Sequence, residues 1–162
     1  MLGRALAYAA SGTDQNEDDT RGGASMNTKQ WVVGTVAGGV VVFGVGYVIF
    51  EVLLGDFYAA NAGSATGAMR EPQIIWAVGV GALAYAALIL YAMKSQAAPA
   101  SVASGMKVGA IVGFLIWACA DFTFYGITNV NNLTLTVVDP LVELVHGGIA
   151  GAVLGALLPK LA

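Results

Sequence analysis

The sequence predicts an all-α membrane protein that folds as a bundle of four transmembrane helices. Of its 162 residues, 57% are hydrophobic and only 10% are charged, whereas a soluble domain carries about 25% charged residues. The mean hydropathy is +0.75. Apolar stretches occur four times along the chain, and each approaches the about 20 residues that a helix needs to cross the hydrocarbon layer.

The first two spans are predicted at residues 31–54 and 74–93. Both are apolar over most of their length. The first carries Glu51 in its last turn, and the second is bounded by Pro72 and Lys94. Because lipid offers the backbone no hydrogen-bond partners and a helix satisfies its own, we expect both stretches to be helical.

The third and fourth spans are predicted at residues 106–125 and 138–158. Ionisable residues interrupt them, namely Asp121 in the third and Glu143 and His146 in the fourth. Helices are still expected here, because any other backbone exposed to lipid would leave polar groups unpaired.

The basic residues predict the orientation of the spans. Four lysines flank the start of the first span, the connection between the second and third spans, and the C-terminus. These are Lys29, Lys94, Lys107 and Lys160. In a four-span protein these places share one side, and the other side holds only Arg70. Short cytoplasmic loops carry the excess of Lys and Arg, so both termini are expected in the cytoplasm.

Residues 1–25 differ in composition from the rest of the chain. They are polar and acidic, and their apolar run is too short for a signal peptide. A segment of this kind does not bury enough apolar area to order itself. Two interpretations stay open: a disordered acidic tail, or a start assigned too early, with the protein beginning at Met26. The four-helix domain is expected at 26–162.

Glycines recur every four residues in the third and fourth spans. They are Gly105, Gly109 and Gly113 in the third span, and Gly147, Gly151 and Gly155 in the fourth. Small residues at this spacing form one stripe on which helix backbones approach closely. We interpret the stripes as packing faces within one chain; a homodimer or another membrane protein are the alternative partners.

Ionisable side chains at membrane depth are costly, face the bundle interior and often mark function. With the termini inside, all such side chains fall in the extracytoplasmic third of their spans. They are Glu51, Asp121, Asp139, Glu143 and His146. Helical periodicity extends the glycine stripe of the fourth span to Glu143 and places Glu51 on one face with Gly44. We therefore predict that Glu51, Asp121 and Glu143 meet in one polar pocket that opens outward.

The loop between the third and fourth spans adds hydroxyl and amide groups next to these acids. Tyr125 and Asn129 are its candidates for the same ligand- or ion-binding site. Amides and carboxylates suit small polar ligands or hard cations. They also suit a loop that caps two helix ends, and this structural interpretation is favoured for the loop.

The ionisable residues have structural interpretations too. Asp139 precedes Pro140, and Asp at the N-cap with Pro at the first helical position is an ordinary helix start. Glu51 can extend to the membrane interface. Asp121 and Glu143 can be protonated and hydrogen-bonded to neighbouring helices.

Glu143 and His146 have the spacing found in carboxylate-bridged dimetal bundles. Those centres require a second such motif and two further glutamates, so a dinuclear centre is not expected, and the identity of any metal stays open. A single divalent cation, or a proton exchanged between Glu143 and His146, are the remaining alternatives. No cofactor is expected.

Two segments resemble the hairpins of an uncharacterised family of four-helix bacterial integral membrane proteins, typed as a domain of unknown function. The matching residues are Gly38–Gly44, Leu53–Tyr58 and Asn61 in the first hairpin, and Asp121–Tyr125, Thr128–Asn129, Asn132–Leu133 and Val137–Asp139 in the second. The resemblance implies the four-span topology and favours Asp121, Tyr125, Asn129 and Asp139 as site residues. It also implies a location in a bacterial inner membrane, and it implies no activity.

Three classes of function remain. The preferred one is a protein that binds or passes a small cation, a proton or a polar solute at the outward pocket. The alternative is an accessory or structural subunit that docks another membrane protein through glycine-lined helix faces. The third class is an intramembrane enzyme that uses Glu143 or Asp121 as acid or base; it stays open but is disfavoured, because no nucleophile–base pair is recognisable. No basic patch indicates a nucleic acid partner.

Overall fold

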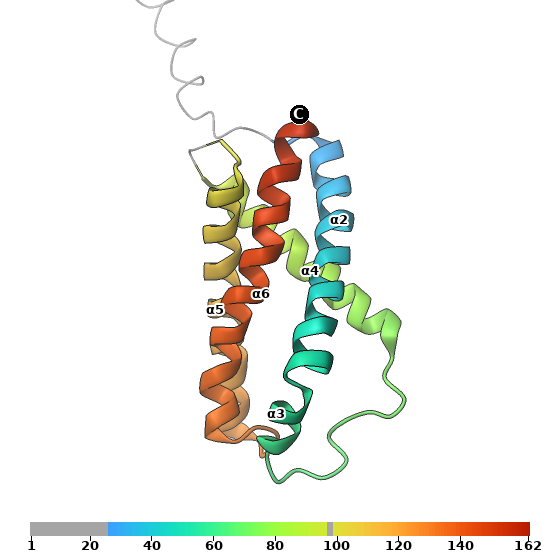
Figure 1. Cartoon of the computed structure of the whole chain (residues 1–162), viewed down its shortest axis with the longest axis vertical. Coiled ribbons are helices and arrows are strands. Elements are labelled where there is room, and N and C mark those ends of the chain that lie inside the picture. Colours follow the sequence, from blue (N-terminus) through green and yellow to red (C-terminus); the bar gives the residue numbers. More distant parts are fainter. Residues whose placement is uncertain (1–25, 97–98) are drawn as a thin grey trace, which may run out of the picture.

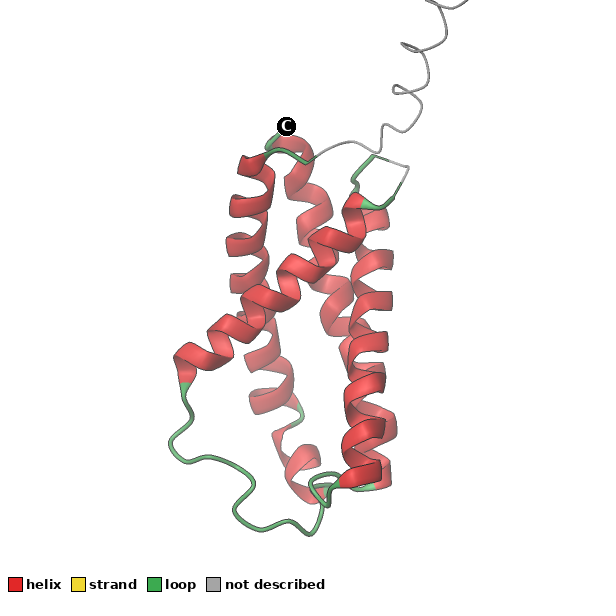
Figure 2. Cartoon of the chain, turned by 180° about the vertical axis from the view of Figure 1, so that it is seen from behind, coloured by secondary structure: helices red, strands yellow, loops and turns green. Residues whose placement is uncertain are grey.

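The computed structural model describes residues 26–96 and 99–162. Its long helices are α2 (Thr28–Gly46), α4 (Ile75–Lys94), α5 (Val102–Ile127) and α6 (Leu133–Leu157). They run alternately up and down, and α4 crosses the other three diagonally (Figures 1 and 2). The N-terminal segment 1–25 predicted as a tail or an early start lies outside the described residues.

Short elements extend the long helices. A π-helical segment, η2 (Tyr47–Leu53), continues α2 and is followed by the short α3 (Gly55–Ala60), while η3 (Leu158–Lys160) continues α6. In η2 the backbone bonds reach five residues back, as in Leu54 N–H to the Ile49 carbonyl at 2.9 Å.

All four long helices are long and apolar enough to cross a membrane. The predicted fold class, an all-α bundle of four such helices, is confirmed, and the chain is a multi-pass membrane protein. We call the end of the bundle that carries the four exposed lysines the lysine end, and the end with the loops after α3 and α5 the loop end (Figure 1).

Side-chain caps set the starts of three helices. The side chains of Asn27, Ser101 and Asn132 accept bonds from the backbone N–H groups of Gln30, Ser104 and Leu135, which satisfies donors that have no partner inside the helix. α6 therefore starts five residues before the predicted position, and Asp139 and Pro140 lie inside it. The interpretation of Asp139 as a helix cap is wrong, because Asn132 already performs that function.

Asn132 also joins α6 to the segment after α3. Its Nδ2 group donates to Asn61 Oδ1 at 3.2 Å, and its Oδ1 accepts from Leu135 N–H at 2.9 Å. We expect Asn132→Ala to lower the free energy of unfolding by about 1 kcal/mol. Asn132→Asp, which keeps the accepting oxygen, should cost less. The exposed Asn129→Ala is the control; an equal loss in this variant, measured by unfolding in detergent, would contradict the capping account.

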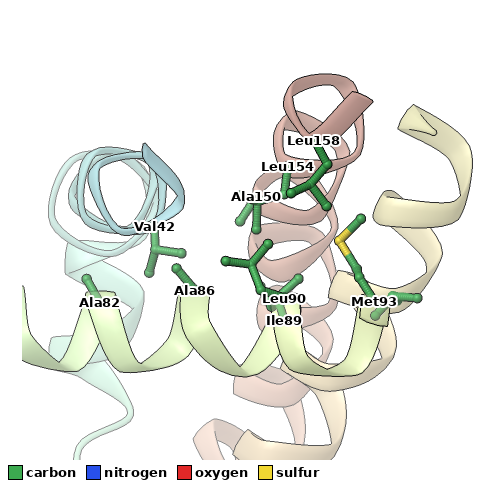
Figure 3. Packing of buried hydrophobic residues seen from close by; sticks show 10 residues of the cluster. Val42, Ala82, Ala86, Ile89, Leu90, Met93, Ala150, Leu154 and Leu158 are labelled. Atoms are coloured by element: carbon green, nitrogen blue, oxygen red, sulfur yellow. The ribbon is translucent and has the colours of Figure 1, made fainter. Parts of the chain in front are cut away.

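An apolar core fills the lysine end of the bundle. α4 directs Ala86, Ile89 and Leu90 between α2 and α6, where they meet Leu154 and Leu158 (Figure 3). These side chains are fully or almost fully buried. The core therefore holds α4 against α2 and α6 near its C-terminal end.

α5 and α6 touch through their backbones at the glycine stripes. A Cβ atom added to Gly109 would lie 2.0 Å from the Gly147 carbonyl oxygen, and one added to Gly151 would lie 2.1 Å from that of Gly105. Gly113 lies against the Glu143 carbonyl in the same way, and Gly155 against that of Ser101. The structure thus places all six glycines between α5 and α6.

The two connections at the loop end bind each other. Gly63 N–H donates to the Val130 carbonyl at 2.6 Å, and Ala65 N–H donates to the Asn129 carbonyl at 3.0 Å. A Cβ atom on Gly63 would lie 2.0 Å from the Asn129 oxygen, so this crossing requires glycine. The contact fixes the segment that carries Asn131 beside the end of α5.

Candidate functional site

Six polar side chains from α3, α4, α5 and α6 interact inside the bundle, toward its loop end. We call them the polar cluster: Tyr58, Tyr85, Asp121, Asp139, Glu143 and His146. The three carboxyl groups and the imidazole are buried, with exposed fractions of 3% for Asp121, 6% for Asp139, 2% for Glu143 and 4% for His146. Because burying unpaired charge is costly, the contacts of each group decide what the cluster can do.

Glu143 and His146 form the inner part of the cluster. They are three residues apart on α6, and His146 Nδ1 lies 2.9 Å from Glu143 Oε2. Tyr85 of α4 donates to the same oxygen at 3.2 Å. On the other side of the ring, His146 Nε2 lies 2.9 Å from the carbonyl oxygen of Val42 in α2. The imidazole therefore links α6 to α2.

Aromatic rings enclose His146. Phe50 in η2 and Tyr85 each meet it edge to face, with ring centroids 5.5 and 5.8 Å away. Phe50 also packs edge to face against Tyr58, at 5.4 Å. This apolar wall limits access of water to the imidazole from the η2 side and keeps the local dielectric constant low.

Tyr58 and Asp139 join α3 to α6. The Tyr58 hydroxyl donates to Asp139 Oδ1. Burial raises the pKa of Tyr58 above its ordinary value, and the bond to the Asp139 carboxylate raises it further. Tyr58 is therefore a neutral hydrogen-bond donor at physiological pH.

Asp121 forms the part of the cluster nearest the loop end. Its Oδ1 accepts a bond from Asn131 Nδ2 at 3.3 Å. Its Oδ2 is buried and has no hydrogen-bond partner among the described residues. Buried polar atoms are seldom left unpaired, so this oxygen is an acceptor whose hydrogen bond the surrounding described side chains do not supply.

The cluster contains no basic partner other than His146. Within residues 26–96 and 99–162, the only contact in salt-bridge range is the one between His146 and Glu143, and the lysines and Arg70 are exposed. In the described ranges no three His, Cys, Asp or Glu side chains are arranged to hold a metal ion. The carboxyl groups and the imidazole can each bind and release a proton, and this is the chemistry that the arrangement offers.

The structure brings together four of the predicted site residues and separates three. Asp121, Asp139, Glu143 and His146 belong to the polar cluster, whereas Tyr125 and Asn129 are exposed on and beyond the last turn of α5. Glu51 is exposed as well and accepts a bond from Gln73 in the following loop at 3.3 Å.

The predicted meeting of Glu51 with Asp121 and Glu143 is therefore wrong. Its premise was that Gly44 marks the packing face of the first span, but a Cβ atom on Gly44 would have nothing within 4 Å. α2 packs instead through Gly34, Gly38 and Gly39. In η2 it is Phe50 that turns toward the cluster.

The depth of the inner residues also differs from the prediction. Because α6 begins at Leu133, Glu143 and His146 lie near the middle of this helix and not in its outer third. His146 correspondingly meets Val42, near the middle of the continuous helix Thr28–Leu53. The polar cluster thus extends from the loop end to the centre of the bundle.

Sequence reasoning missed two members of the cluster. Tyr58 resembles an interfacial anchor, since aromatic residues collect at span ends. Tyr85 was not singled out, although its hydroxyl lies in the middle of an apolar span and requires a partner there. That unmatched hydroxyl is the signal that could have identified it.

Comparison with protein-family models, curated proteins and solved structures finds no match to this chain.

Proposed function

We propose that this protein binds a proton in its polar cluster, taken up from the extracytoplasmic side of a bacterial inner membrane. The observation that carries the proposal is the position of His146 between Glu143 and the Val42 carbonyl. A carbonyl oxygen only accepts hydrogen bonds, so His146 Nε2 carries a hydrogen. The proton that the cluster takes up is then the one between His146 Nδ1 and Glu143 Oε2.

A proton between Glu143 and His146 turns their close approach into a hydrogen bond. Without it, the Nδ1 lone pair would face a carboxylate oxygen at 2.9 Å, inside a region with no other positive charge. With it, the pair is either an imidazolium beside a carboxylate or an imidazole beside a carboxylic acid. Both forms make a hydrogen bond, and the exchange between them is a short proton transfer.

The lysines support the orientation. All four lie at the lysine end, where α2 and α5 begin and α4 and α6 end. Under the positive-inside rule this end and both termini are cytoplasmic, and the loop end is extracytoplasmic. Asp121 then lies nearest the outside and His146 deepest, which is the order required for uptake from that side.

Because His146 is the only histidine, its ring nitrogens can be observed without overlap. We expect the ¹⁵N spectrum of histidine-labelled protein in lipid to show Nε2 protonated and Nδ1 sharing a proton at neutral pH. Acidifying or alkalinising the medium on the extracytoplasmic side of oriented vesicles should change the Nδ1 signal. The preparation requires an affinity tag without histidine.

Glu143→Gln is the matched variant for this measurement. The glutamine is neutral and can donate to Nδ1, so the ring should be held neutral, with hydrogen on Nε2 alone, across the pH range. An unprotonated Nε2 in the wild type, or an Nδ1 signal that is the same in both proteins, would contradict the proposal. Glu51→Gln, at an exposed position, should leave the spectrum unchanged.

Docking of another membrane protein through glycine-lined faces is less well supported. The six glycines of α5 and α6 already contact each other's backbones within the chain. Surfaces used for internal packing do not serve a partner at the same time. We also propose that the chain belongs to the four-helix bacterial family that it resembles, and this membership is compatible with either function.

A further inference from the structure

Asp121 and Asp139 form a carboxyl pair nearest the loop end of the polar cluster. α5 and α6 are antiparallel, and Gly105 and Gly109 pack against Gly155 and Gly151. Advancing in steps of four residues along each helix from these contacts brings Asp121 opposite Asp139. This register makes the two buried carboxyl groups neighbours on facing helices.

Each carboxyl group has one oxygen occupied by a neutral donor. Asn131 donates to Asp121 Oδ1, and Tyr58 donates to Asp139 Oδ1. Asp121 Oδ2 is left buried and without a partner. Asn131 and Tyr58 bring no positive charge, so they do not compensate the charge of two neighbouring carboxylates.

We propose that Asp121 and Asp139 share a single proton, as a carboxylic acid paired with a carboxylate, and that this pair is the entry site for the proton of the polar cluster. The proton supplies the hydrogen bond that Asp121 Oδ2 lacks. It also removes one of two like charges that would otherwise face each other in a buried site.

The other titratable groups that face the pair do not supply its missing charge. Tyr58 of α3 is a neutral donor, and Glu143 of α6 is an acid. Tyr85 of α4 contributes another hydroxyl, bound to Glu143. His146 is already engaged by Glu143 and Val42, and η2 directs Phe50, an uncharged ring, toward this region.

The position of the pair suits an entry site. Asn131, which binds Asp121, lies half-buried in the loop-end crossing that joins the two connections. Asp139 precedes Glu143 by one turn of α6, so the two acids project from the same face. The pair thus lies between the loop end and the Glu143–His146 pair. The inference rests on the proposed function for the direction of uptake, but not for the shared proton itself.

Infrared difference spectroscopy of the protein in lipid tests the shared proton. We expect a protonated carboxyl band at neutral pH that shifts when aspartate is ¹³C-labelled at its carboxyl carbon, which separates it from Glu143. Asp121→Asn and Asp139→Asn should each abolish this same band. In either variant the new amide can donate to the remaining carboxylate, so the proton is no longer needed.

Asp56→Asn is the matched control, because Asp56 is exposed in the first turn of α3; the band should be unchanged. A band that survives in either single variant at Asp121 or Asp139 would overturn the proposal. So would a wild-type protein whose aspartates are all ionised at neutral pH. Loss of the band on adding sodium or potassium at fixed pH would also overturn the proposal, because a monovalent cation would then displace the proton from the pair.

The result can be separated from that for the proposed function. The aspartate band reports the outer pair, and the ¹⁵N signals of His146 report the inner pair. If the histidine spectrum does not depend on Glu143 while the aspartate band behaves as expected, the shared proton stands and the proposed function fails. The reverse pattern would overturn the entry site alone.

Discussion

His146→Leu is expected to lower the free energy of unfolding by about 3–5 kcal/mol, the loss found when one partner of a buried pair is removed. The substitution leaves Glu143 buried without its imidazole and removes the bond to the Val42 carbonyl that links α6 to α2. Leucine has a similar volume, so the loss should arise from polar groups and not from a cavity. Reversible unfolding in bicelles or mixed micelles provides the measurement.

A double-mutant cycle separates this cause from a general loss of packing. In a Glu143→Gln background a neutral amide replaces the buried acid. His146→Leu should therefore lower the free energy of unfolding by less, and the difference, which is the coupling energy, should be about 0.5–3 kcal/mol. An equal loss of unfolding free energy in both backgrounds would show that the Glu143–His146 contact does not stabilise the bundle. Glu51→Gln, at an exposed acid, should change stability by no more than about 0.5 kcal/mol.

Gly109→Ala and Gly151→Ala are each expected to destabilise the bundle by about 3 kcal/mol, at the upper end of overpacking costs. The added methyl group would lie 2.0 and 2.1 Å from backbone carbonyl oxygens of the facing helix. Backbone atoms do not move aside as a flexible side chain does. α5 and α6 must therefore separate, which also shifts Glu143, whose carbonyl contacts Gly113.

Gly79→Ala and Gly81→Ala in α4 are the matched controls, because a Cβ atom at either position would have nothing within 4 Å. Alanine is the better helix former by about 1 kcal/mol, so these variants should be neutral or more stable. If all four alanine variants had similar stabilities, close backbone contact between α5 and α6 would not be what holds the pair together.

Helix number and type could be predicted from the sequence because they depend on local composition. Each span is apolar over a length that crosses the hydrocarbon layer, and no tertiary contact is needed to recognise it. Helix boundaries were less certain: Asp139–Pro140 has the pattern of a helix start, yet Asn132 caps α6 earlier. Asn132 and Asp139–Pro140 are both typical of helix starts and lie close together, and the sequence alone does not show which of them begins α6.

The presence of a polar site could be predicted for a similar reason. Asp121, Glu143 and His146 interrupt apolar spans, and the cost of placing them in lipid requires them to face the interior of the bundle. The spacing of the glycines likewise indicated faces for close packing. The ionisable residues and the four-residue spacing of the glycines could both be recognised within single helices.

Only the tertiary structure decided which side chains meet. Tyr58 and Tyr85 join the cluster while Glu51 does not, because the packing of neighbouring helices determines which face of each helix points into the bundle. His146 binds the carbonyl of a residue 104 positions away in the chain. Such a contact depends on the rotation and crossing of two helices, and these are set by the packing of the whole bundle rather than by the residues near either partner.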